Sequence, residues 1–199
     1  RILEHAILPQ LGHRAQYKSI DKLLEVPTHF HHRFAQWNQL ALMKSPAVIR
    51  ELREYLRFAI EKEGLGKFIT LIENDLGYPL YKAVADVKAA LSHNAQSTLA
   101  FRASGLGYEL ALDATIERSA FETWIADDLQ KLEDAVDEVL GEAGLGASEI
   151  DRVFLTGGTS FVPAVRAIFD QRFGEKKIET GDQLESIAYG LALIANSAD

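Results

Sequence analysis

Residues 151–163 hold a short apolar run, two consecutive glycines, two hydroxyl residues and a proline within thirteen positions. The run Val153–Leu155 has the length and residue types of a buried β-strand. The pair Gly157–Gly158 predicts a tight turn after that strand, and Pro163 predicts the first turn of a helix. A strand, a glycine turn and a helix in this order are typical of an α/β domain with a parallel sheet.

The glycine pair also suits a ligand site. Backbone without a Cβ atom lets a flat or anionic ligand come very close, and Thr159 and Ser160 add hydroxyl groups beside it. The free N–H groups and the dipole of the following helix favour a polar or anionic group at the same place, so a nucleotide is the natural occupant. Taken alone, the pair is explained equally well as a tight connection between a strand and a helix.

The stretch after this segment continues the alternation of helix and strand. We expect a helix from Pro163 to Phe173, a short strand near Ile178 and a last helix through Ile187 and Leu191.

The part of the chain before Ser97 predicts helices and no strand. Apolar residues recur at helical spacing in two sets, which are Phe30, Phe34, Trp37 and Leu40, and Val48, Leu52, Leu56 and Ile60. Ser45 and Pro46 predict an N-cap and a first helical turn between the two sets. Gly64 and Gly66 predict a break, followed by a helix over residues 68–76 and another that starts at Tyr78-Pro79.

The apolar period then changes. Residues 97–101 and 108–112 flank a turn containing Gly105 and Gly107, which predicts a β-hairpin. Ser119 and Glu122 have the spacing of a capping box. The long amphipathic helix that we expect from there ends near residues 141–146, and its apolar face holds Phe121, Ile125, Leu129, Leu132 and Val136. We expect a helical subdomain with the hairpin over residues 1–118 and an α/β subdomain over residues 119–199.

The segment 151–163 resembles the adenosine-binding motif of the actin, hexokinase and heat-shock ATPase superfamily. DnaK-type chaperones fit best, because their Gly-Gly-hydroxyl-hydroxyl-x-aliphatic-Pro signature is followed by an Ala-Tyr-Gly helix, here residues 188–190. Residues 87–101 look like the chaperone helix that leads into a β-ribbon, and residues 116–122 are similar to the start of a further chaperone helix. The resemblance covers about residues 84–195. The long stretch from Pro27 to Gly77 looks like the divergent, YegD-like branch of the family.

The resemblance implies an actin-like ATPase (ribonuclease H-like) α/β lobe with a mostly helical insertion subdomain that carries the hairpin. It implies that Lys88 and Ser92 approach the ribose and the base of ATP or ADP, beside Gly157, Gly158, Thr159 and Ser160. Phe161 stands where the chaperone pattern has an arginine that stacks on adenine, and we expect its aromatic face to meet the base.

Two acidic, glycine-rich hairpins hold Mg²⁺ and the phosphates in this superfamily, Asp-x-Gly-Thr in one lobe and Asp-x-Gly-Gly in the other. Neither occurs in this sequence. Phosphoryl transfer depends on that positioning and charge neutralisation, so we expect ATP hydrolysis and Mg²⁺ binding only in a complete parent protein. The chain also opens on Arg1 without an initiator methionine, so we expect a fragment whose N-terminal lobe lies upstream.

Composition excludes several classes of partner. The formal net charge of -8 argues against a nucleic-acid backbone or an anionic membrane. The chain has 0 cysteines, which agrees with a reducing, cytoplasmic location. We expect no metal site, because His29, His31 and His32, with His5 or His13, fit a packed or solvated helix face better than a ligand set. The carboxylates of residues 127–138 fit the wet face of a helix, and no hydrolase or P-loop motif is present.

Two other functions remain open from the sequence. One is a non-catalytic protein-interaction module, in which Trp37, Phe34 and Tyr55 are exposed on one face of the helical insertion and the glycine turn is a relic. The other is a sugar or acetate kinase of the same superfamily, although the motif at residues 157–163 and the Lys88 helix suit the chaperone branch better. For the leading hypothesis, a protein client or a co-chaperone is the expected further partner.

Overall fold

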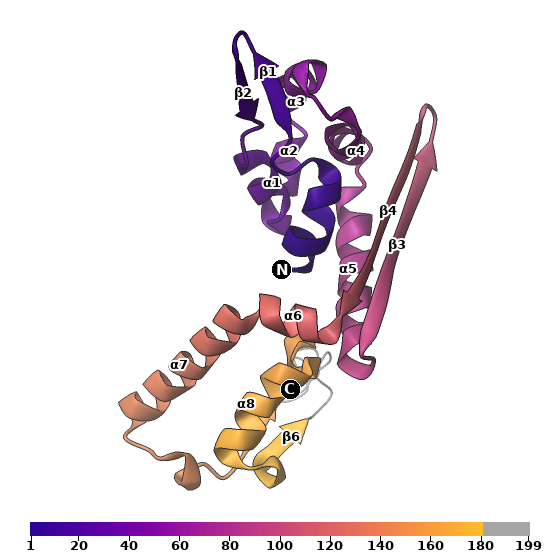
Figure 1. Cartoon of the computed structure of the whole chain (residues 1–199). Helices are drawn as coiled ribbons and strands as arrows, with labels where there is room; N and C mark the ends of the chain where they lie inside the picture. The colour runs from indigo at the N-terminus through magenta and orange to yellow at the C-terminus, as the bar shows by residue number, and fades with distance from the viewer. Residues whose placement is uncertain (181–199) are drawn as a thin grey trace, which may run out of the picture. The chain divides into compact units, whose positions relative to one another are not determined.

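The computed structural model describes residues 1–180, which divide into two compact units (Figure 1). The first unit comprises residues 1–87 and 95–124. The described part of the second unit comprises residues 88–94 and 125–180. Helix α5 contributes to both units, so each unit is described by itself.

The helices of the first unit are short at its beginning and longer afterwards. They are η1 (Leu3–Ile7), η2 (Leu8–Leu11), α1 (His29–Phe34), η3 (Trp37–Gln39), α2 (Leu40–Met43), α3 (Pro46–Phe58), α4 (Lys62–Glu73), α5 (Gly77–His93) and α6 (Arg118–Trp124). The helix predicted across Phe30 and Leu40 is therefore wrong as a single element. The chain leaves helical geometry at Gln36, whose φ of -107° and ψ of 106° are extended.

A short hairpin near the N-terminus was not predicted. Strand β1 (Gln16–Ser19) pairs antiparallel with β2 (Lys22–Glu25), so the prediction that no strand precedes Ser97 is wrong. Its turn, Ile20-Asp21, contains no glycine, and Ile20 has a φ of 40° that bulky residues rarely adopt. Four-residue strands and a turn without glycine leave little signal in the sequence.

Helices α3 and α4 begin for different reasons. The side chain of Ser45 accepts a hydrogen bond from the backbone N–H of Val48 at 3.3 Å, so the predicted N-cap is confirmed. The predicted break at Gly64 and Gly66 is wrong, because both lie inside α4. Gly64 instead allows a close backbone approach, since a Cβ atom built on it would lie 2.6 Å from the backbone nitrogen of Gly12.

Aromatic rings form the centre of the first unit. Phe30, Phe34 and Phe68 are almost fully buried, and Phe34 meets Phe68 edge-to-face with ring centroids 5.4 Å apart. The ring of His31 stacks on Phe68 with centroids 4.3 Å apart. Tyr81 in α5 donates a hydrogen bond from its hydroxyl to the carbonyl of Phe34, and burial raises its pKa to about 12.

The predicted long hairpin is confirmed and extends further than expected. Strands β3 (Gln96–Gly105) and β4 (Tyr108–Glu117) pair antiparallel in register from Gln96 opposite Glu117 to Gly105 opposite Tyr108. Gly107 has a φ of 82°, which suits the two-residue turn. Leu99, Leu110 and Leu112 are almost fully buried, as expected for one covered face.

The long helix predicted after this hairpin is two helices. Helix α6 begins at Arg118, so Ser119 lies within it and does not cap it, and α7 (Ala126–Ala143) begins after Ile125. The predicted end is confirmed, because Gly144 follows α7 with a left-handed φ of 65°.

The second unit has a small parallel sheet. Strand β5 (Val153–Leu155) pairs with β6 (Ile178–Thr180), and α8 (Pro163–Phe173) connects them, as predicted. Arg172 of α8 forms an ion pair with Asp137 of α7 and donates a hydrogen bond to the carbonyl of Glu133 at 3.3 Å. Short 3-10 turns complete the unit at η4 (Ala147–Glu149), η5 (Gly158–Phe161) and η6 (Glu175–Lys177). The last predicted helix and residues 188–190 lie outside the described residues.

Candidate functional site

The glycine turn lies between β5 and α8. Gly157 has a φ of 82° and a ψ of 160°, a combination that is accessible essentially to glycine alone. The predicted burial of the strand holds at Leu155, which is 6% exposed, but not at Phe154, which is 64% exposed. The strand therefore has one covered face in the described part of the chain.

The space above both glycines is open. Within residues 1–180, a Cβ atom built on Gly157 or on Gly158 would meet no heavy atom within 4 Å. In contrast with Gly64, these glycines are therefore not needed for packing against another segment of the described chain. The open space lets the planar or anionic part of a ligand reach the backbone, so the turn fits the predicted kind of ligand.

The three residues after the glycines differ in burial and in hydrogen bonding. Ser160 is only 7% exposed, and its hydroxyl donates a hydrogen bond to the carbonyl of Gly157 at 2.6 Å. Its backbone N–H donates to the same carbonyl at 3.1 Å, so Ser160 holds the turn in shape. Thr159 is exposed and Phe161 is 41% exposed, which leaves a hydroxyl and an aromatic ring accessible beside the glycines.

The helix that follows does not start directly at the turn. Residues 158–161 form η5, and α8 begins only at Pro163, which has no N–H group. The backbone N–H groups nearest to Gly157 therefore belong to Gly158 and Thr159, which have no acceptor within the first turn of η5. The N-terminus of α8, whose dipole was predicted to favour an anionic group at the glycine turn, therefore lies one turn further along the chain.

Lys88 and Ser92 lie four residues apart in α5, so they share one face of that helix. The Ser92 hydroxyl donates a hydrogen bond to the carbonyl of Lys88 at 3.4 Å. Both side chains are half-buried, and residues 88–94 belong to the same compact unit as the glycine turn. Within residues 1–180, no hydrogen bond or ion pair joins either side chain to the turn.

The histidines of the first unit lie in and beside its aromatic core. His31 is fully buried, while His13 lies edge-on to it with ring centroids 5.3 Å apart. His29 and His32 are exposed, and His5 stacks on Trp124. In the described part of the chain, no three histidine or acidic side chains gather in a group that could hold a metal ion.

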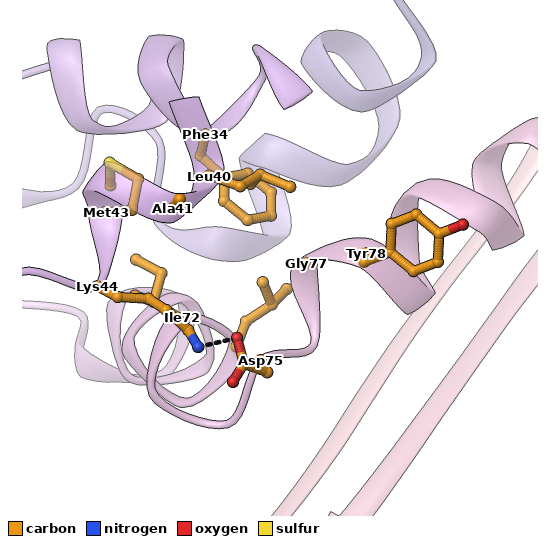
Figure 2. A pocket seen from close by; sticks show the side chains of 10 residues that line it. Phe34, Leu40, Ala41, Met43, Lys44, Ile72, Asp75, Gly77 and Tyr78 are labelled. Carbon is orange, nitrogen blue, oxygen red and sulfur yellow. Dashed lines mark ion pairs between the residues drawn. The ribbon is translucent and has the colours of Figure 1, made fainter. Parts of the chain in front are cut away.

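The structure places only part of the predicted interaction face at the surface. Trp37 is 75% exposed, but Phe34 is 1% exposed and belongs to the core, so its predicted exposure is wrong. Tyr55 is half-buried, and its ring meets that of Tyr17 with centroids 4.9 Å apart. The sequence did not predict the apolar pocket next to this region, because its walls come from helices that meet only in the folded chain (Figure 2).

None of the helices within residues 1–180 combines the length and the apolar character needed to cross a membrane.

Comparison with known proteins finds one family and its curated relatives. The family profile described as "Hsp70 protein" matches residues 64–197. The chain is 32% identical over 120 residues to a "Chaperone protein DnaK" of Deinococcus deserti, a match that covers 58% of this chain and 19% of that protein. It is 33% identical over 86 residues to the protein of the same name from Deinococcus proteolyticus, covering 43% of this chain and 14% of that protein.

The mixture of helices and strands, together with the family match, fits an α/β protein of the actin-like fold. The chain belongs to the Hsp70 family. The predicted resemblance to DnaK-type chaperones is confirmed, and the match begins at residue 64 instead of near residue 84. The matched segments span less than a fifth of the curated DnaK relatives, at 19% and 14% of their lengths. The YegD-like assignment stays a prediction.

Proposed function

We propose that the second unit binds an adenine nucleotide, ATP or ADP, at the Gly157-Gly158 turn. The observation that carries this proposal is the open space that residues 1–180 leave above both glycines, beside an exposed hydroxyl and an exposed aromatic ring. A strand followed by a glycine turn and a helix is a common place for nucleotide phosphates and sugars. The DnaK-type relatives support the assignment to this ligand class.

Each predicted site residue then has a distinct role. Gly157 makes the bend that only glycine adopts, and Gly158 lets the nucleotide approach the backbone. Thr159 offers its hydroxyl to the ligand, and Phe161 offers an aromatic face to the adenine. Ser160 is a positioning residue, because its hydroxyl is hydrogen-bonded to the Gly157 carbonyl.

Lys88 and Ser92 supply the second wall of the proposed site. In the DnaK-type pattern this helix contacts the ribose and the base, and here both residues lie on one face of α5. The lysine ammonium is a donor for ribose hydroxyls, and the serine hydroxyl can both donate and accept.

Binding and hydrolysis are separate in this proposal. The sequence contains neither of the acidic, glycine-rich hairpins that hold Mg²⁺ and the phosphates in the superfamily. Residues 1–199 therefore bind the adenosine part, and hydrolysis with Mg²⁺ requires the N-terminal lobe of a complete parent. That parent acts as a nucleotide-switched chaperone with a protein client or co-chaperone, because closure around the nucleotide shifts the populations of its states.

A calorimetric titration of ADP with Mg²⁺ tests the proposal, using the full-length protein and this chain in parallel. We expect Gly158→Asp to abolish binding, because the new carboxylate fills the approach to the backbone and repels the phosphates. Gly141→Asp is the matched control, since Gly141 also has no heavy atom within 4 Å of a built Cβ atom but lies in α7.

Binding by the parent that is lost in Gly158→Asp and kept in Gly141→Asp supports the nucleotide site. Equal binding by the parent, by Gly158→Asp and by Gly141→Asp places the nucleotide elsewhere. No binding by the parent removes the nucleotide function and leaves only the family fold.

A further inference from the structure

A pocket between β1 and α3 in the first unit takes no part in the proposed nucleotide site. Its volume is about 370 Å³, and pockets that hold small ligands have volumes of about 300–1,000 Å³. Both elements precede residue 64, where the family match begins. The pocket therefore belongs to a part of the chain that the family profile does not describe.

Backbone contacts hold the two walls of this pocket together. Tyr17 of β1 forms an antiparallel bridge with Ala59, the residue that follows α3. The N–H of Ile60 donates a hydrogen bond to the carbonyl of Gln16 at 2.9 Å. The strand is thereby fixed against the end of the helix, so the pocket is formed before any ligand arrives.

Three aromatic side chains line the pocket, and they are Tyr17, Tyr55 and Phe58. The rings of Tyr17 and Tyr55 have centroids 4.9 Å apart and are inclined to one another by 62°. Phe58 follows Tyr55 by three positions in α3, a spacing that brings side chains to neighbouring places on a helix. The rings therefore bound a corner, which suits a rounded group better than a flat one.

Aromatic rings of this kind select a cation. The face of each ring carries negative potential, so a positive group over the face is attracted and an anion is disfavoured. The chain itself contains one such contact, because the guanidinium carbon of Arg57 lies 5.7 Å from the centroid of the Phe58 ring. Phe58 is 54% exposed, so its ring is also accessible to a group from outside.

Carboxylates add negative charge beside the rings. Glu54 lines the pocket, and the Tyr55 hydroxyl donates a hydrogen bond to Glu51 at 3.3 Å. Burial raises the pKa of Tyr55, and Glu51, Tyr17 and Glu54 raise it further, so the phenol stays neutral near these carboxylates. Within residues 1–180, Glu54 forms no ion pair, which leaves its charge available to a ligand.

Lys18 is the only cationic residue among the described residues that line the pocket. Its side chain belongs to an exposed residue, and a lysine ammonium is a strongly hydrated point charge that gains little by leaving water. A quaternary ammonium group has no N–H to hydrate and carries its charge under methyl groups, so it exchanges water for aromatic faces more readily.

We propose that this pocket binds a quaternary ammonium group, held by the rings of Tyr17, Tyr55 and Phe58 and by the carboxylate of Glu54. Such a group is carried by a free molecule of the choline type or by a trimethylated lysine of another protein, and the recognition chemistry is the same for both. This inference is independent of the nucleotide site.

The first test compares choline with its uncharged isostere. Calorimetric titration of the full chain with choline and with 3,3-dimethyl-1-butanol separates the charge from the shape, because the two ligands differ in one atom, nitrogen or carbon. We expect the dissociation constant of choline to be at least about tenfold lower. Absence of choline binding, or equal binding of the two ligands, would overturn the proposal.

Variants of Phe58 test the aromatic wall. We expect Phe58→Leu, which keeps an apolar side chain and removes the ring, to raise the dissociation constant of choline at least about threefold. Phe58→Trp should lower it, because indole is the strongest cation acceptor of the three ring types. Phe154→Leu is the matched control, since Phe154 is 64% exposed but lies in β5. Circular dichroism identical to that of the unchanged chain excludes misfolding.

Charge variants test the sign of the selected ligand. Glu54→Lys should abolish choline binding, whereas Glu138→Lys, the same change at an exposed position of α7, should not. Lys18→Gln should strengthen binding about threefold, because it removes a like charge from the lining. Added salt should weaken binding as it screens Glu54. Choline binding that is unchanged in both Phe58→Leu and Glu54→Lys contradicts the assignment to this pocket.

A peptide with one trimethyllysine, beside the same peptide with an unmodified lysine, identifies the source of the group. Tighter binding of the trimethylated peptide than of choline supports a modified protein as the ligand, and equal or weaker binding supports a free molecule. Equal binding of the modified and unmodified peptides, at an affinity above that of choline, would show recognition of the peptide and not of the quaternary ammonium group, and would overturn the proposal.

Discussion

His31 is an ionisable ring inside an aromatic core. Its Nε2 atom lies 3.0 Å from the carbonyl oxygen of Leu11, which can only accept a hydrogen bond, so the neutral ring carries its proton on Nε2. Its Nδ1 atom is buried and has no partner in the described part of the chain. Burial lowers the pKa of His31 to about 4, with a smaller raising effect of the Leu11 hydrogen bond and lowering effects of His13 and His32.

The stability of the first unit should therefore fall in mild acid. The unfolded chain binds the His31 proton at the ordinary pKa of 6.5, whereas the folded chain binds it only near 4. Stability is fully present above pH 6.5 and is lost as the pH falls toward 4. We expect urea unfolding to show a loss of about 2 kcal/mol from pH 7 to pH 5. His31→Phe should remove most of this loss, and His29→Gln, at an exposed position, should not; equal pH dependence in all three proteins would contradict the assignment.

The two glycines of the turn should differ when each is changed to alanine. Gly157 has a φ of 82°, so Gly157→Ala is expected to destabilise the second unit by about 1–3 kcal/mol. Gly158 does not have a positive φ, and residues 1–180 leave open space around it, so Gly158→Ala is expected to change stability by less than about 0.5 kcal/mol. Its new methyl group should still weaken ADP binding. Urea unfolding and calorimetric titration separate these effects, and a stable Gly157→Ala would show that the turn can relax.

The two glycines inside α4 have opposite surroundings. Gly64→Ala would place a Cβ atom 2.6 Å from the backbone nitrogen of Gly12, so α4 and η2 must move apart. Gly66→Ala meets nothing within 4 Å and should stabilise the helix by about 0.5–1 kcal/mol. We expect opposite shifts of the urea midpoint, with a loss of about 1–3 kcal/mol for Gly64→Ala. A gain in both variants would mean that the close contact is not needed.

Prediction from sequence succeeded where an element is defined by its own residues. The alternation in residues 97–112 identified the β3–β4 hairpin, and Pro163 and Phe173 marked both ends of α8. It failed at Gly64, because a glycine that permits contact between two helices has the same local signature as a helix break. The same limit applies to the site, since the hydrogen bond of Ser160 to the Gly157 carbonyl depends on the folded shape of the turn.

The whole molecule combines two units that each bury an apolar core. Phe30, Phe34 and Phe68 belong to the first unit, and Leu155 and Val165 to the second. The family match, residues 64–197, extends over parts of both, whereas the residues of α1 to α3 precede it. His31 and the glycine turn are therefore groups in different units, which allows each unit to be perturbed separately.

Scanning calorimetry of the full chain should show this independence. Acidification from pH 7 to pH 5 should lower the transition of the first unit, because only that unit buries His31. ADP at about a hundred times its dissociation constant should stabilise the second unit by about 2.7 kcal/mol, which corresponds to a shift on the order of 10 °C for a small domain. Gly158→Asp should abolish the ADP-induced shift of the second unit and keep the acid-induced shift of the first. His31→Phe should abolish the acid-induced shift and keep the ADP-induced one. A single transition that responds to both changes would mean that the two units unfold as one cooperative body, with the nucleotide stabilising both cores together.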